Sequence, residues 1–497
     1  MAVVIMCYLN QTGFEVELPL DIKRKILMLK FISAEKRWYT FEEISQHIKI
    51  STKTISKDLL MITDILPSTW EIKVKKGYGV KLFMPINASI EEIITYFFRT
   101  SIKFKILGIL FHCENATVAC IADKLYVQPY VVTKSLKRIE KDLSHYNLKL
   151  QRKPLRIVGS EWEILLMYSE LYLKASLYSE WPFSCEQSSI LKFIENAESY
   201  MRRHFYISSK RFASYYLSTL LTRKQQGYSN EWKDLFSSLQ TSNFYIISTQ
   251  LEPLEQKFNV SLSEADKMIV TILFNSLYYT YIDADKVKKQ DMTTLKEGKV
   301  AIFTLVKEFI NRLFQTLEDK FIKEEQFICI LIEHFRKRIY LLHVHSHIKR
   351  FETVDIQYIK RKYLKTFLQV KKVYYDWIQE YQIATYVPDE EIIDIVLYIE
   401  SYRITYNNTA KKMIIISEEG ESWKHYISAL LKKEFGNKIE LITKNVRNIL
   451  KEHTNTTKNI DFIVSTIPLD LKYYPVILIQ PIITERDLQN IRNFINL

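Results

Sequence analysis

Glycine is scarce in this chain, and that scarcity limits what the chain can fold into. Only nine of the 497 residues are glycine, whereas a typical globular protein contains about 7%. Loops that cradle nucleotide phosphates depend on glycine, and neither GxGxxG nor GxxxxGKS/T occurs here. Leucine and lysine are good helix formers and are abundant. The sequence therefore predicts a mainly helical fold and argues against a nucleotide-driven enzyme.

Length and cysteine usage narrow the class of protein further. A domain usually takes about 100–200 residues, so this length predicts several domains. The five cysteines are scattered without a CxxC motif, which predicts reduced thiols rather than disulfides or a zinc site. No uncharged apolar run reaches the roughly 20 residues that span a membrane. We expect a cytoplasmic protein without a cofactor, a bound metal or a membrane partner.

The positive charge is concentrated in the first third of the chain. The net charge is +13, and residues 1–160 contribute 25 Lys and Arg against 15 Asp and Glu, a net of +10. A local basic excess is the electrostatic footprint of a domain that binds a phosphate backbone. The alternative is a merely soluble, lysine-rich surface of the kind that AT-rich genomes encode.

A first helix-turn-helix pattern begins at Thr40. Thr40 and Glu43 have the spacing of a capping box, in which each side chain satisfies a backbone amide of the other residue. After a polar break, Ile55, Leu59 and Ile62 form one apolar stripe of a second helix. Short hydrogen-bond donors and lysines are left outside this stripe, as a recognition helix in a major groove requires. We expect DNA contacts from Thr52, Lys53, Thr54, Ser56 and Lys57.

Strand-like runs at 71–75 and 80–83 follow, joined by a turn with two glycines. This predicted hairpin resembles a wing that lies along the DNA backbone, with Lys75 and Lys76 as its contacts. A single helix-turn-helix match is weak, because any two short helices can imitate it.

The pattern recurs about 75 residues later. A short helix at 117–125 and a turn at 126–128 precede Pro129, which is tolerated at the first position of a helix. The second helix carries the apolar stripe Val132, Leu136, Ile139 and Leu143. A basic hairpin at 148–159 follows. The expected DNA contacts are Tyr130, Thr133, Lys134 and Lys137 on the helix, and Arg152 and Lys153 on the hairpin.

The rest of the chain divides into a helical part and a small α/β part. Residues 161–405 are rich in aromatic residues and poor in glycine, and they suggest two helical bundles of about 115 residues each. Alternating strands and helices then predict a parallel sheet, since parallel strands need helical crossovers. The expected strands are 412–417, 439–442, 461–465 and 475–480, and the expected helices are 422–435 and 485–496.

This order of parts resembles the Mga/AtxA family of virulence regulators from Gram-positive bacteria. The resemblance rests on the architecture and on two short motifs, residues 51–60 with 75–82 and residues 152–161. It implies two winged helix-turn-helix units at 1–88 and 89–163. It also implies two bundles like phosphotransferase-system regulation domains (PRDs) at 164–292 and 293–408, and an enzyme IIB-like α/β domain at 409–497.

The resemblance also implies a function and a mode of control. Family members are DNA-binding transcription regulators, mostly activators, that self-associate as homodimers or higher homo-oligomers. Their PRD-like bundles are phosphorylated on histidine by phosphocarrier proteins of the sugar phosphotransferase system. In this chain His334 corresponds to one acceptor position and His204 is a second candidate, whereas Tyr216 and Tyr398 occupy other acceptor positions. The enzyme IIB-like loop at 417–422 contains no cysteine.

Three other classes of protein remain as alternatives. An RNA-binding antiterminator shares PRD bundles, but its N-terminal module would need exposed aromatics or a dimeric sheet. An enzyme lacks support, because no Ser/His/Asp arrangement or metal cluster is apparent and His343, His345 and His347 have no further ligand at a convincing spacing. A scaffold leaves the basic first third unexplained. The sequence favours a regulator that binds double-stranded DNA in AT-rich or bent promoter regions.

Overall fold

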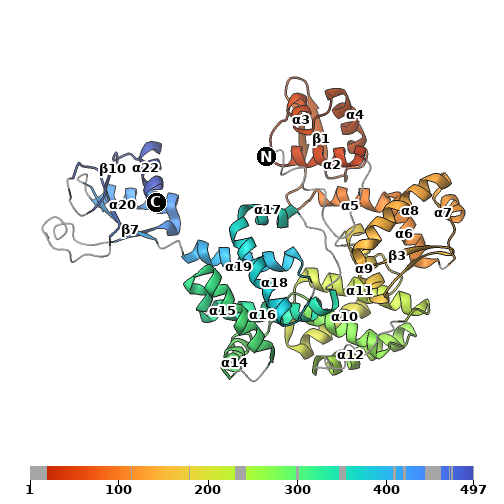
Figure 1. Ribbon diagram of the computed structural model, residues 1–497. Coiled ribbons are helices and arrows are strands. Elements are labelled where there is room, and N and C mark those ends of the chain that lie inside the picture. Colours follow the sequence, from red (N-terminus) through yellow and green to blue (C-terminus); the bar gives the residue numbers. More distant parts are fainter. Residues whose placement is uncertain are drawn as a thin grey trace. The chain divides into compact units, whose positions relative to one another are not determined.

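The computed structural model is mainly helical, as the sequence predicts (Figure 1). It describes residues 20–113, 115–177, 179–229, 242–297, 301–345, 354–384, 386–406, 410–417, 421–442, 460–469, 471 and 474–495. The chain divides into two compact units, Met1–Val396 and Leu397–Leu497. None of the described helices combines the length and the apolar character needed to cross a bilayer.

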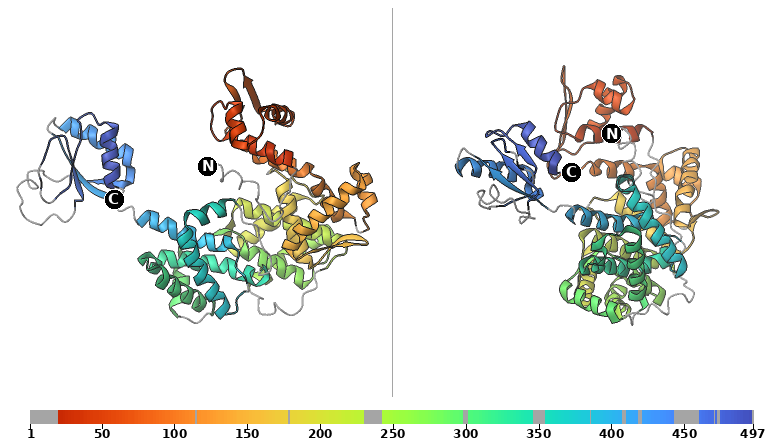
Figure 2. Two further views of the ribbon diagram at one scale, coloured as in Figure 1. Left: turned by 45° about the horizontal axis from the view of Figure 1, so that its top comes forward. Right: turned by 60° about the vertical axis from the view of Figure 1, so that its left-hand side comes forward.

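The N-terminal part of the first unit contains a three-helix group followed by a hairpin. Its elements are α2 (Leu20–Ser33), α3 (Phe41–Ile48), α4 (Thr52–Thr63), β1 (Glu71–Lys75) and β2 (Gly79–Phe83). The capping box predicted at Thr40 and Glu43 is present, with both reciprocal hydrogen bonds. The predicted stripe of α4 is fully buried, and β1 pairs antiparallel with β2 (Figure 2).

The same arrangement is repeated in the next segment. Its elements are α5 (Glu91–Thr100), α6 (Ile102–His112), α7 (Val118–Leu125), α8 (Pro129–Leu143), β3 (Lys149–Arg152) and β4 (Leu155–Val158). Pro129 is the first residue of α8, as predicted. In both segments the residue before the helix pair bridges to the hairpin, Tyr39 to Val80 and Ala116 to Leu155. This shared bridge fixes each hairpin beside its helices.

Helices make up most of the remainder of the first unit. The first group is α9 (Glu161–Ala175), α10 (Gln187–Met201), α11 (Ile207–Gln225), α12 (Ser242–Phe258) and α13 (Glu264–Ser276), with the short antiparallel strands β5 (Arg203–Phe205) and β6 (Tyr279–Tyr281). The second group is α14 (Ala284–Glu297), α15 (Ala301–Leu317), α16 (Glu325–His345), α17 (Val354–Lys362), α18 (Leu364–Glu380) and α19 (Asp389–Tyr406).

One hydrophobic core runs from Ile26 in α2 to Tyr279 in β6. It therefore joins both helix-turn-helix segments to the first helical group. The second group has an aromatic centre of its own, in which Phe309, Phe335, Tyr374 and Trp377 have ring centroids 4.8–5.8 Å apart.

The C-terminal unit contains a four-stranded parallel sheet in the order β10-β9-β7-β8, which confirms the predicted parallel α/β part. Its elements are β7 (Lys411–Ile416), α20 (Glu421–Phe435), β8 (Ile439–Leu441), β9 (Phe462–Ser465), β10 (Val476–Leu478) and α22 (Glu485–Ile495). Met413 and Ile415 share one buried cluster with Ile427 of α20 and Ile491 of α22. Both described helices therefore cover the same face of the sheet (Figure 2).

The expected borders at 163/164 and 292/293 fall inside α9 and α14, and the border between the two compact units falls inside α19. The expected border at 408/409 lies outside the described residues. The five-domain division therefore stays a prediction.

Candidate nucleic-acid interface

The start of α4 presents the predicted contact residues on its outer face. Ser51 caps the helix, because its hydroxyl accepts a hydrogen bond from the Thr54 amide at 3.2 Å. The Thr54 hydroxyl lies 2.9 Å from the Ser51 hydroxyl, so Thr54 takes part in the cap as well. The side chain of Thr54 is half-buried, and the exposed members of the set are Thr52, Lys53, Ser56 and Lys57.

The hairpin β1–β2 holds its lysines over aromatic rings. Lys75 Nζ lies 4.1 Å from the ring centroid of Tyr78, and both residues are exposed, as is Lys76. Gly79 closes the turn at φ +99°, and a Cβ there would lie 2.0 Å from the Tyr39 carbonyl oxygen. Glycine is therefore required at this position if the hairpin is to reach the bridge before α3.

The second helix pair exposes aromatic and basic side chains together. Tyr126 ends α7 in the left-handed conformation with 96% of its surface exposed, and Tyr130 in the first turn of α8 is 71% exposed. Thr133, Lys134 and Lys137 lie exposed along α8. Within the part of the chain that the structure describes, no ion pair holds Lys134 or Lys137. Their ammonium groups are thus available to phosphate.

The second hairpin places its two predicted residues in different environments. Arg152 forms a bidentate pair with Glu140 of α8, with nitrogen–oxygen distances of 2.7 and 3.0 Å. Lys153 is exposed at the turn. The Arg152 guanidinium therefore braces the hairpin against α8, a role that the basic pattern of the sequence does not reveal.

A buried acidic residue fixes the second helix of each pair to the helix that directly precedes the pair. Asp58 of α4 is 2% exposed and pairs with Arg24 of α2, with one nitrogen–oxygen distance of 3.0 Å. Asp142 of α8 is 4% exposed and pairs with Lys103 of α6. Neither ion pair involves the exposed face of α4 or α8, so these faces stay accessible to a binding partner.

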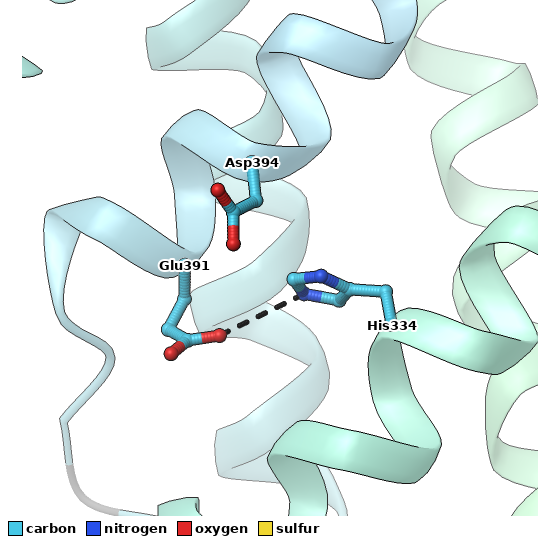
Figure 3. Close-up of side chains that lie close together, drawn as sticks. All are labelled: His334, Glu391 and Asp394. Carbon is cyan, nitrogen blue, oxygen red and sulfur yellow. Dashed lines mark ion pairs between the residues drawn. The ribbon is translucent and has the colours of Figure 1, made fainter. Parts of the chain in front are cut away.

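The two candidate phosphorylation sites differ sharply in exposure. His204 is exposed on β5, opposite Thr280 of β6. His334 of α16 is 6% exposed, and its Nε2 lies 3.8 Å from a Glu391 carboxylate oxygen on α19. Asp394, one turn farther along α19, lies beside them (Figure 3).

Glu391 and Asp394 were not singled out from the sequence. They follow His334 by 57 and 60 residues, a spacing that matches no local motif.

Tyrosines occupy the other expected acceptor positions. Tyr216 of α11 is buried, and burial raises the pKa of its hydroxyl well above the ordinary value. Tyr398 of α19 is exposed. His343 and His345 belong to the end of α16. His347 is one of residues 346–353, which lie outside the described residues.

Comparison with known proteins assigns the chain to a family. Residues 86–172 match the Mga helix-turn-helix domain, a segment that includes the second helix pair, its hairpin and most of α9. The capsule synthesis positive regulator AcpB of Bacillus anthracis is 39% identical, over 96% of this chain and 99% of that protein. The chain belongs to the Mga/AtxA family of regulators.

Two further relatives in the Mga/AtxA family also match along nearly their whole length. The capsule synthesis positive regulator AcpA of Bacillus anthracis is 33% identical, over 95% of this chain and 99% of that protein. The anthrax toxin expression trans-acting positive regulator of the same organism is 24% identical, over 96% and 99%. All three relatives carry names of positive regulators.

Proposed function

We propose that this chain is a positive transcriptional regulator that binds duplex DNA through two winged helix-turn-helix units. One observation carries the proposal. In the basic first third of the chain, two helix pairs each expose lysines on their second helix and are each followed by an antiparallel hairpin. The names of the relatives AcpB and AcpA, both positive regulators, support activation rather than repression.

In this mechanism α4 and α8 each enter a major groove, and the hairpins follow the phosphate backbone. Lys53, Lys57, Lys134 and Lys137 neutralise phosphates, while Thr52, Ser56 and Thr133 are short enough to reach base edges. Four of these seven exposed side chains are lysines, which neutralise phosphates without reading base edges. We therefore propose a preference for AT-rich or bendable promoter DNA, which is read through its shape.

The decisive test compares matched lysine pairs in the full-length protein. Fluorescence anisotropy with an AT-rich duplex would be measured for Lys53→Ala/Lys57→Ala and for Lys134→Ala/Lys137→Ala. Lys192→Ala/Lys289→Ala, on exposed positions of α10 and α14, removes the same charge far from α4 and α8 in the sequence. Each interface pair should weaken binding, whereas the control pair should not. An equal loss of affinity in all three variants would mean that binding depends on the net charge of the protein and not on α4 and α8.

Self-association is part of the same proposal. Two copies on one duplex would hold four basic units at high effective concentration and raise the affinity without any new contact. The proposed interface is the α/β domain at 409–497. Sedimentation of the full chain should give a dimer or a larger homo-oligomer, and a chain ending at residue 408 should give a monomer. A full-length monomer at micromolar concentration would contradict this part.

Control by phosphocarrier proteins is the last part of the proposal. His204 is accessible on β5, whereas a phosphoryl group on His334 would lie beside Glu391 unless α16 and α19 separate. Incubation with a phosphorylated phosphocarrier should label the parent protein at histidine, and His204→Ala should remove label that His112→Ala retains. Absence of label from the parent would exclude this mode of control.

A further inference from the structure

Three side chains with metal-binding atoms converge between α16 and α19. His334, Glu391 and Asp394 each bring one ligand atom within 4.8 Å of the other two (Figure 3). The side chains of His334 and Glu391 are 3% and 6% exposed, and that of Asp394 is half-buried. The Tyr278 hydroxyl lies 3.4 Å from Asp394 Oδ2 and can donate to it, orienting that carboxylate from outside. The figure shows the two carboxylates and the imidazole facing a common point.

The two carboxylates of this cluster attract cations. Glu391 and Asp394 lie three residues apart on one face of α19, where like charges repel. Burial makes that repulsion more costly, because carboxylates lose water that would otherwise stabilise them. Of the three cationic residues that next follow His334 on α16, Arg336 pairs with Asp291 and Lys337 with Glu333, whereas the side chain of Arg338 lies outside the described residues.

The dimensions suit a first-row transition metal. Zinc bonds are about 2.0–2.2 Å long to nitrogen and oxygen, so tetrahedral ligand atoms lie roughly 3.3–3.5 Å apart. The 3.8 Å between His334 Nε2 and Glu391 Oε2 needs a shift of a few tenths of an ångström, and the three ligand atoms, which all lie within 4.8 Å of one another, close to this spacing by side-chain adjustments of up to about 1 Å. Three protein ligands leave a fourth position for water. An imidazole ligand disfavours magnesium and calcium, which prefer oxygen alone.

We propose that His334, Glu391 and Asp394 form a binding site for a divalent transition metal ion of the zinc type. Such an ion would join α16 to α19 through bonds to both helices. It would also occupy a ring nitrogen of His334, so that metal binding and phosphorylation of that nitrogen exclude each other. The metal site is independent of the proposed DNA contacts, because no residue of the first 160 takes part.

Zinc binding to the full-length protein tests the proposal. After treatment with a chelator, calorimetric titration should give one tightly bound zinc ion per chain. Glu391→Gln and Asp394→Asn each remove one ligand while keeping the side-chain volume, and each should weaken zinc binding by at least about tenfold. Asp376→Asn on α18 makes the same change as Asp394→Asn at an exposed position, and it should leave the affinity unchanged.

Two further readouts keep the test decisive. Cobalt bound to the parent protein should show the intense visible absorption of a tetrahedral site. This absorption should be absent from Asp394→Asn. Circular dichroism checks that each variant is folded. If Glu391→Gln fails to fold, the test relies on Asp394→Asn, because Asp394 is only half-buried. The proposal is overturned if the parent binds no zinc at micromolar concentrations, or if folded Asp394→Asn binds it as tightly as the parent.

Discussion

At the scale of single residues, Lys53 and Lys57 carry the clearest electrostatic prediction. Both are exposed on the outer face of α4, and neither forms an ion pair with any residue that the structure describes. Each lysine that contacts a DNA phosphate contributes about 0.9 to the slope of log affinity against log salt. Lys53→Ala/Lys57→Ala should therefore lower that slope by about two. A salt titration by anisotropy measures it, and an unchanged slope would place α4 away from the backbone.

The cap of α3 gives a prediction about stability. Thr40 and Glu43 satisfy each other's backbone amides, so Thr40→Ala should destabilise this segment by about 0.5–2 kcal/mol. Hydrogen exchange of the α3 amides, compared between parent and variant, measures the loss. Thr100→Ala, at the exposed end of α5, serves as a control whose effect on α3 should be negligible.

Glu43 adds a pH dependence to this cap. Its hydrogen bond from the Thr40 amide, together with Arg37, lowers the pKa of the carboxyl below the ordinary value. The folded state therefore binds this proton less readily than the unfolded state. Its stabilising contribution should be complete above the ordinary glutamate pKa and disappear as the pH falls through the lowered one. The measured quantity is the protection of the α3 amides relative to the intrinsic exchange rate at each pH. An equal loss of protection in parent and Glu43→Gln on acidification would contradict this assignment.

At the scale of elements, the buried Lys103–Asp142 pair joins α8 to α6. Both side chains are less than a tenth exposed, so Asp142→Asn would leave a buried ammonium without its counter-charge. Loss of one partner of a buried pair typically costs about 3–5 kcal/mol. Hydrogen exchange of α6 and α8 should accelerate together in Asp142→Asn. Glu140→Gln removes a half-exposed carboxylate from the same helix and should have a much smaller effect.

The elements also show what the sequence could and could not predict. The cap at Thr40, the stripe of α4 and the position of Pro129 were predictable because their signals are local. The ion pair between Arg152 and Glu140 was not predictable, because the sequence does not show whether a basic residue in a hairpin has an acidic partner. Nor was the convergence of Glu391 and Asp394 on His334, which depends on how α16 and α19 pack.

At the scale of the whole molecule, the core of the second helix-turn-helix segment continues into the first helical group. Phe111 of α6 is buried against Tyr168 and Tyr172 of α9, with centroid distances of 4.5 and 5.5 Å. The Tyr168 hydroxyl also donates to the Leu107 carbonyl of α6 at 3.2 Å. The side chains of α6 and α9 therefore belong to one packed core.

Phe111→Ala tests that continuity. Removing a buried phenylalanine typically costs about 3–5 kcal/mol. Because α6 and α9 share this contact, their amides should lose protection from hydrogen exchange together, while those of α15 in the second helical group should not. Loss confined to α6 would mean that the two regions are energetically separate.

Binding of duplex DNA by the basic first third can be measured by a salt titration of the full-length protein. The titration would compare an AT-rich duplex with an RNA of matched sequence. We predict tight binding to the duplex with a steep salt dependence that becomes shallower when Lys53, Lys57, Lys134 and Lys137 are all changed to alanine. A slope unaffected by the four changes would exclude these lysines as DNA contacts, and preference for the RNA would favour an antiterminator.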